Sequence, residues 1–215
     1  ISIAWLPLIV YDQQHIQLSF VFVVQTIMVI TFFGAILTLI LSDIIDFHYQ
    51  NSITDAMTGL YNRRYFLQRC KVIISAAKRH ESPLSAIICD IDSFKNVNDT
   101  YGHAVGDDAL CHFGRIITEQ LRTTDFAFRL GGDEFLALLP NTREDEAQVV
   151  KGKVQQALAD TPLSIPQGEL FLNASFGVCE MTPEDCFESL LNRADESMYQ
   201  HKRALKANRL TDFSI

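Results

Sequence analysis

The pattern of apolar and charged positions divides the chain near residue 50. Residues 16–42 carry no charged side chain, and no Lys or Arg precedes Arg63. As a helix, these 27 residues would extend about 40 Å, more than the roughly 30 Å hydrocarbon core of a membrane. We therefore expect residues 16–42 to span a membrane, with residues 1–10 as the end of an earlier span and residues 11–15 as an outer loop.

The segment after the expected span predicts a rigid connection. Residues 43–53 contain neither Pro nor Gly, so the membrane helix is expected to continue to the start of the next domain. This segment is too short to establish a heptad repeat, and coiled-coil pairing is left open. We assign residues 1–50 to the membrane segment with its linker helix, and residues 51–215 to one domain of ordinary size.

From residue 51 on, apolar positions follow strand and helix spacing in turn, which predicts an α+β fold. The expected strands are 84–89, 126–128, 135–139 and 170–179, the last as a strand pair or one long strand. The expected helices start at Asn62, at Asp107, at Thr142 together with Asp145, and at Thr182-Pro183. Their apolar faces are Leu67, Cys70, Ile74 and Ala77; Leu110, Phe113, Ile117 and Leu121; Ala147, Val150, Val154 and Ala157; and Phe187, Leu190, Leu191, Ala194 and Met198.

Charge and cysteine content limit the partners that the chain can bind and the cellular compartment of its domain. The net charge of −8 and the lack of a basic stripe argue against nucleic acid as a partner. The cysteines at positions 70, 89, 111, 179 and 186 lack paired metal-ligand spacing, which is typical of reduced thiols in a cytoplasm. A weak charge asymmetry places the Arg63 side of the span inside.

The hairpin expected within residues 126–139 carries acids at its turn. Gly131 and Gly132 tolerate the positive φ of a tight turn, and Asp133 and Glu134 follow them directly. Taken alone, this pattern is more typical of an ordinary hairpin with solvated acids than of a catalytic site.

A second pair of acids, Asp90 and Asp92, directly follows the expected strand 84–89. If this strand neighbours the hairpin, Asp90 and Asp133 approach closely enough to share divalent cations, which take oxygen ligands and bridge phosphates. Lys95 would add positive charge beside them. The alternative is that Asp90 and Asp92 only cap the turn after the strand.

Together these motifs resemble those of the GGDEF domain family, whose active members are diguanylate cyclases that condense two GTP into cyclic di-GMP. The resemblance covers about residues 51–209. It implies a palm-like domain similar to nucleotide cyclases, with a central, mostly antiparallel sheet flanked by helices, here preceded by a transmembrane helix. The matching segments are 55–64, 90–95, 98–107, 129–135 and 194–202.

The resemblance implies roles for the acids and for one lysine. Asp133 matches a metal ligand that is also the proposed base for the attacking 3′-hydroxyl, and Glu134 completes or supports the cation site. Asp90 and the backbone carbonyl of Ile91 match the other metal ligands. Magnesium is the expected ion, with manganese as the alternative. Lys95 matches a residue that stabilises negative charge on the triphosphate, so Asp133, Glu134 and Lys95 form the expected catalytic set.

The resemblance also implies a substrate site. Asn98 and Asp107 match the pair that binds guanine, since a carboxylate accepts from the N1–H and 2-amino groups that adenine does not present together. The alternative for Asp107 is a cap of the following helix. Phe94 and His103 belong to the matching substrate-side segments, although a lone histidine is more often structural. Lys202 matches a basic residue that reaches the phosphates from the last helix.

Two further features concern phosphate binding and regulation. Residues 205–209, Leu-Lys-Ala-Asn-Arg, stand where the family has Gly-Arg-Asn, so Lys206 is expected to replace the arginine as a point charge instead of a planar fork. Arg122 and Asp125 match the family's inhibitory site for cyclic di-GMP, five residues before the turn. Elsewhere the Arg-x-x-Asp pattern is frequently only a surface ion pair.

The resemblance therefore implies a magnesium-dependent diguanylate cyclase in the inner (cytoplasmic) membrane, with its catalytic domain in the cytoplasm. GTP is the expected substrate, a homodimer the expected assembly, and cyclic di-GMP the product and feedback ligand. The alternative is a catalytically silent sensor that binds GTP or cyclic di-GMP, and an inert dimerisation module is a third hypothesis. The presence of Asp90, Lys95, Asp133 and Glu134 argues against both alternatives.

Overall fold

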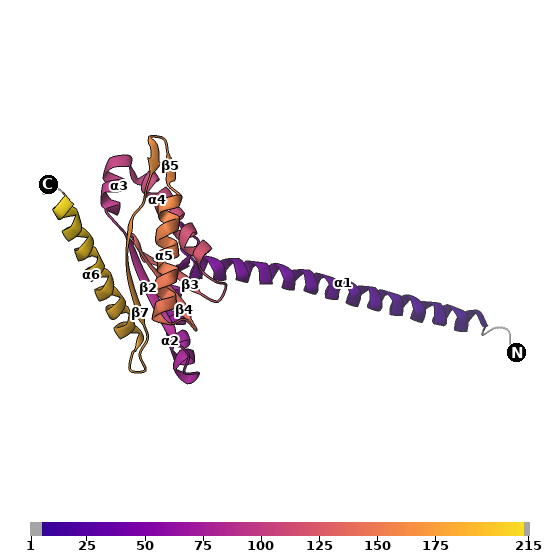
Figure 1. Ribbon diagram of the computed structural model, residues 1–215. Coiled ribbons are helices and arrows are strands. Elements are labelled where there is room, and N and C mark those ends of the chain that lie inside the picture. Colours follow the sequence, from indigo (N-terminus) through magenta and orange to yellow (C-terminus); the bar gives the residue numbers. More distant parts are fainter. Residues whose placement is uncertain (1–5, 213–215) are drawn as a thin grey trace. The chain divides into compact units, whose positions relative to one another are not determined.

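The computed structural model describes the backbone of residues 6–212 and the side chains of residues 21–45, 53–200 and 202–203. The chain divides into two compact units, Ile1–Gln50 and Asn51–Ile215. Nearly all of the first unit is helix α1 (Leu6–Ile53), and the second unit holds every strand of the described part of the chain (Figure 1).

Helix α1 is continuous through residues 11–15, so the loop expected there is wrong. That segment has no Pro or Gly to stop a helix, and Pro7 lies in the first turn, where its missing N–H breaks no hydrogen bond. Within α1, Val21–Ile45 is long and apolar enough to cross a membrane, by length and composition alone. No side chain of this segment is buried in the chain.

The second unit is built on a five-stranded sheet with the strand order β1-β3-β4-β2-β7. Only the β1–β3 pair is parallel, and the other three pairs are antiparallel. The expected α+β fold with a mostly antiparallel sheet is therefore confirmed. The strands are β1 (Tyr61–Asn62), β2 (Leu84–Ile91), β3 (Phe126–Gly131), β4 (Glu134–Pro140) and β7 (Ala174–Glu180), and a separate hairpin consists of β5 (Leu163–Ile165) and β6 (Gly168–Leu170).

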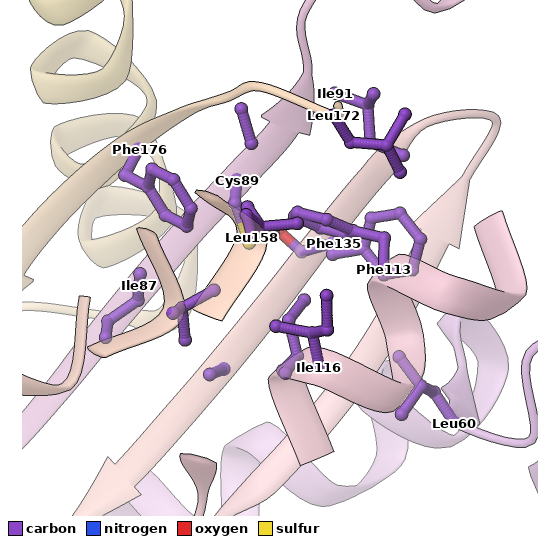
Figure 2. Close-up of a cluster of buried hydrophobic side chains, with 14 of the residues drawn as sticks. Leu60, Ile87, Cys89, Ile91, Phe113, Ile116, Phe135, Leu158, Leu172 and Phe176 are labelled. Carbon is purple, nitrogen blue, oxygen red and sulfur yellow. Dashed lines mark hydrogen bonds between the residues drawn. The ribbon is translucent and has the colours of Figure 1, made fainter. Parts of the chain in front are cut away.

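Helices cover both faces of the sheet (Figure 1). Alternate residues of β2 point to opposite faces, so Ile87 and Cys89 pack in one apolar cluster while Ala86 and Ile88 pack in the other. Figure 2 shows the first of these clusters, where Phe135 of the sheet packs edge-on against Phe113. The helices on this face are α4 (His103–Gln120) and α5 (Glu144–Asp160), with α3 (Phe94–Tyr101) beside α4, and those on the other are α2 (Arg63–Arg79) and α6 (Phe187–Asp212).

The expected cap of α2 is confirmed, but its expected apolar face is partly wrong. The side chain of Asn62 accepts a hydrogen bond of 2.9 Å from the backbone N–H of Tyr65. Leu67 is 45% exposed, and Phe66 is buried in its place. Phe66 and Cys70 lie four residues apart and therefore on one face of the helix, whereas Leu67 lies on the neighbouring face.

The expected starts of two later helices are also corrected. Helix α5 has Arg143 as its N-cap, because Thr142 is buried and its carbonyl accepts the hydroxyl of Ser85 at 3.0 Å. Helix α6 starts at Phe187, later than Thr182-Pro183. The buried carboxylate of Asp185 accepts from the backbone N–H and the hydroxyl of Thr182, which holds a turn ahead of the helix.

Gly177 sets how closely α6 approaches the sheet. A Cβ atom at this position of β7 would lie 1.9 Å from the carbonyl oxygen of Ala194 and 2.5 Å from the backbone nitrogen of Met198. Both of those atoms belong to the backbone of α6, so a side chain at 177 would push the helix outward. Met198 lies one turn before Lys202, and the close packing at Gly177 therefore fixes the position from which Lys202 extends.

We expect Gly177→Ala to lower the free energy of unfolding of the second unit by about 2 kcal/mol, because the helix backbone cannot move away locally. Gly152→Ala is the matched control. This glycine lies inside α5 with nothing within 4 Å of its Cβ position, so alanine there should raise stability by about 0.5–1 kcal/mol. Urea unfolding of the two variants measures both effects. Equal stability of the two variants would contradict the packing account.

Candidate functional site

Acidic residues from two adjacent strands lie at the same end of the sheet. Asp90, near the end of β2, is paired in register with Glu134 at the start of β4. The N–H of the next residue, Ile91, donates to the carbonyl of Asp133 at 3.3 Å. The expected juxtaposition of the central strand and the hairpin turn is therefore confirmed, and it brings Asp90, Ile91, Asp133 and Glu134 together.

The charges at this edge repel one another and attract cations. Burial raises the pKa of Asp90; Lys202 acts in the opposite direction, while the nearby charges of Asp133 and Asp92 raise it further, and the net shift is upward. Lys202 Nζ lies 2.7 Å from Asp90 Oδ1, and the two side chains are 28% and 17% exposed. The site thus has more carboxylates than the one lysine can neutralise.

The turn that carries Asp133 is held in place by hydrogen bonds from Arg129. Gly131 and Gly132 have φ values of 147° and 55°, as the sequence predicts for a tight turn. Arg129 donates from Nε and Nη2 to the carbonyl of Gly132 at 3.0 and 2.9 Å, and its Nη1 lies 3.0 Å from Asp55 Oδ1. The planar fork of the guanidinium thereby ties the turn to the start of the domain.

Asp55 and Arg129 are positioning residues that our sequence-based assignment of roles missed. Burial raises the pKa of Asp55, but hydrogen bonds from Thr58 and the charge of Arg129 outweigh it, so the pKa lies below its usual value. The carboxylate is therefore a stable anionic partner for the arginine. Their places inside the two motifs, one at residue 55 and the other just before the turn, were the signal that could have identified them.

The alternative interpretation has Asp90 and Asp92 cap the turn after β2, but their carboxylates contact Lys202 and Ser175, respectively. The N-cap residue of α3 is Ser93, in the left-handed region at φ 58°. The carboxylate of Asp92 instead accepts the hydroxyl of Ser175 at 2.7 Å, and its N–H donates to the carbonyl of Asn173 at 2.8 Å. These contacts tie the segment after β2 to the start of β7.

The two residues expected to bind guanine lie on either side of the junction of α3 and α4. The side chain of Asn98 packs directly on Gly106, where a Cβ would lie 1.9 Å from Asn98 Oδ1. Asp107 is the next residue and is exposed. It is not a cap, because α4 begins at His103 with Gly102 as its N-cap at φ 86°. The missing side chain at 106 therefore leaves room for the amide beside the carboxylate.

The remaining residues of the expected site lie around this junction and along α6. Phe94 opens α3 and is partly buried against the apolar core, so it packs as a scaffold residue. Lys95 and His103 are exposed, and Lys95 forms no ion pair within the described part of the chain. Lys206 belongs to α6, but its side chain lies outside the described residues.

The donors at the acidic edge suit a hard divalent cation. Carboxylate and carbonyl oxygens are the ligands that magnesium prefers. Within the side chains that the structure describes, however, no group of three or more His, Cys, Asp or Glu is gathered closely enough to hold a metal ion. The chemistry of the donors thus fits magnesium, while their arrangement needs further ligands.

Arg122 and Asp125 lie together on the turn between α4 and β3. The N–H of Arg122 donates to Asp125 Oδ2 at 2.8 Å, and the N–H of Asp125 donates to the carbonyl of Arg122 at 3.0 Å. The carboxylate therefore stabilises the turn, and the Arg122 side chain is exposed. The pair is not one of the ion pairs of the described residues.

A mostly antiparallel sheet with acids at one edge, beside a lysine and a helix junction, defines a palm-like α+β domain of the nucleotide-cyclase kind. The chain belongs to the GGDEF family: the family described as "Diguanylate cyclase, GGDEF domain" matches residues 52–208. This membership confirms the resemblance inferred from the motifs.

Relatives with known names agree with this assignment. The chain is 35% identical over 161 residues to the response regulator PleD of Caulobacter vibrioides, covering 74% of this chain and 36% of PleD. It is 37% identical over 148 residues to the diguanylate cyclase DgcS of Shewanella oneidensis, covering 69% of this chain and 49% of DgcS. The chain thus spans between about a third and half of the length of these relatives.

Solved structures agree as well. The diguanylate cyclase SiaD of Pseudomonas aeruginosa, crystallised with its activator SiaC, superimposes with a TM-score of 0.71 at 32% identity, covering 92% of this chain and 74% of that one. The coiled coil and GGDEF domain of DgcB from Caulobacter crescentus, solved with c-di-GMP, gives 0.75 at 24% identity, covering 80% and 91%. The second likeness establishes the fold alone.

Proposed function

We propose that this domain is a diguanylate cyclase that condenses two GTP into cyclic di-GMP and two pyrophosphates. The observation that carries the proposal is the acidic edge: Asp90, Asp133 and Glu134 lie at the ends of adjacent strands, with Lys202 beside Asp90, in a member of the GGDEF family. An acidic edge of this kind suits cation-assisted phosphoryl chemistry.

Guanine binds at the junction of α3 and α4. Asn98 offers an amide to the purine edge, and Asp107 accepts hydrogen bonds from the N1–H and the 2-amino group. Gly106 keeps the space between them open, since any side chain there would collide with Asn98. The site therefore prefers GTP to ATP. His103 and Phe94 flank it, His103 at the exposed start of α4 and Phe94 as part of its support.

The reaction joins the nucleotides in two like steps. In each step, Asp133 takes the proton of a 3′-hydroxyl, whose oxygen forms a bond to the α-phosphorus of the other GTP. The bond between the α-phosphorus and the oxygen that joins it to the β-phosphorus breaks, and pyrophosphate leaves with the electron pair. Lys95 and Lys202 stabilise the negative charge of the triphosphate, and Lys206 follows Lys202 on α6.

Magnesium, or alternatively manganese, would be held by Asp90, the carbonyl of Ile91, Asp133 and Glu134. When bound, it supplies positive charge that neutralises the triphosphate and the developing charge of the leaving group. The residues themselves orient the hydroxyl and remove its proton. Arg129 keeps Asp133 in place through the carbonyl of Gly132.

Each domain supplies half of the site, so a homodimer is the active assembly. The apolar segment Val21–Ile45 tethers each subunit to the cytoplasmic membrane, with the catalytic domain in the cytoplasm. Pyrophosphate release from GTP and magnesium tests this arrangement. The rate of pyrophosphate release per milligram of protein should rise with protein concentration until all of the protein is dimeric. GTP binding without pyrophosphate at any concentration would instead support the silent sensor.

Cyclic di-GMP inhibits the enzyme at Arg122 and Asp125, where the exposed guanidinium bonds phosphate or a guanine edge. We expect Arg122→Ala to raise the inhibition constant for cyclic di-GMP at least tenfold, since a charge-assisted hydrogen bond contributes about 1.5–3 kcal/mol. Inhibition is measured relative to the initial rate of each variant. The control is Arg115→Ala, which removes an exposed arginine paired only along its own helix. Equal inhibition of both variants would exclude this inhibitory site.

A further inference from the structure

Lys202 forms an ion pair with one carboxylate of the acidic edge, Asp90. Its Nζ lies 2.7 Å from Asp90 Oδ1, in an ion pair whose two side chains are less than a third exposed. Lys95 forms no such pair. The protein itself therefore supplies positive charge beside Asp90.

The position of this ammonium is fixed by the scaffold. Met198, one turn before Lys202, is buried, and the backbone of α6 touches β7 at Gly177 so closely that a methyl group would not fit. Ahead of the helix, Asp185 bonds Thr182 and Ser189 and pairs with Arg193. The packing of α6 against the sheet thus places Lys202 next to Asp90.

The same edge lacks a preformed cage for a metal ion. The described side chains include no cluster of three His, Cys, Asp or Glu with suitable spacing. A dication bound to Asp90 would lie close to the ammonium of Lys202, which is 2.7 Å from Asp90 Oδ1. The repulsion between these two positive charges is strong in a partly buried site. Both features oppose metal binding to the protein alone.

We propose that Lys202 serves as a resident counterion that keeps divalent metal off Asp90 until a nucleotide is bound. The inference rests on the proposed function, and it adds an order of binding to that site. The triphosphate offers Lys202 an alternative anionic partner and offers the metal the oxygen ligands that the protein lacks. Transfer of the ammonium from Asp90 to phosphate then frees the carboxylate, so that metal and nucleotide bind as a coupled pair.

The test is the affinity of the full chain for Mn²⁺ alone, with no nucleotide present, measured from the free-ion signal in electron paramagnetic resonance. We expect Lys202→Met to bind Mn²⁺ roughly tenfold more tightly than the unchanged chain. Arg203→Met is the matched control: it removes the same charge from the adjacent exposed residue, which contacts Tyr199 and not Asp90. This variant should keep the original affinity.

A further variant shows whether Asp90 is the ligand that Lys202 releases. Adding Asp90→Asn to Lys202→Met should abolish the gain. Equal Mn²⁺ affinity of the Lys202→Met and Arg203→Met variants, with both folded by circular dichroism, would overturn the proposal. So would a gain that survives Asp90→Asn. Because no turnover is measured, a chain that failed to make cyclic di-GMP could still confirm this role of Lys202, and the two claims fail separately.

Discussion

Replacing Asp133 with Asn should reduce the rate of cyclic di-GMP formation by at least about a thousandfold, since a positioned general base contributes roughly 10²–10⁴ and the residue also carries a metal-binding charge. The amide keeps the size of the side chain and cannot take the proton of the 3′-hydroxyl. The fold should be unaffected, because the turn is held through the carbonyl of Gly132 by Arg129, without the Asp133 carboxylate. Initial rates at saturating GTP and magnesium provide the measurement.

Asp145→Asn is the matched control for this substitution. It removes an equal charge from an exposed position in the first turn of α5. We expect nearly unchanged activity from this variant and the same thermal unfolding as for the Asp133 variant. If the Asp133 variant retained most of its activity, the assignment of the base and of the metal ligand would both be wrong.

Replacing Asp107 with Ala should remove most of the preference for GTP. The carboxylate is exposed near the start of α4, and it directly follows Gly106, against which the amide of Asn98 packs. Two hydrogen bonds to a charged acceptor contribute about 3 kcal/mol, so kcat/KM for GTP should fall by roughly a hundredfold. The value for ATP should change little, because adenine lacks the matching donors.

The neighbouring Asp108 provides the control for guanine binding. It is exposed on the same helix and carries the same charge, so Asp108→Ala reproduces the change in net charge alone. Its ratio of kcat/KM for GTP over ATP should stay close to that of the unchanged chain. A ratio that falls equally in both variants would point to a general electrostatic effect and contradict the role of Asp107.

The features predicted well from sequence are those encoded locally. Gly131 and Gly132 predicted a turn between two apolar strands, and the apolar run that ends at Cys89 predicted a buried central strand. Each signal lies within a few residues of the element that it specifies. The side chain of Asn62 likewise caps α2 because an N-cap is a contact between residues three apart.

The features that sequence analysis missed depend on contacts between distant parts of the chain. Nothing near Lys202 shows that it reaches Asp90, and nothing near Arg129 shows that it joins Asp55 to the turn. The late start of α6 depends on the buried carboxylate of Asp185, which holds the preceding turn. Such pairs become visible only when the sheet order and helix packing are known.

The most direct test of the central claim is to identify, by mass, the products formed when the purified chain is incubated with magnesium and either GTP or ATP. The account predicts cyclic di-GMP and pyrophosphate from GTP, and no cyclic dinucleotide from ATP. Measurable GTP binding with no product at any protein concentration would contradict it and would make the domain a silent sensor, despite the acids that Asp90 and Asp133 bring to one edge of the sheet.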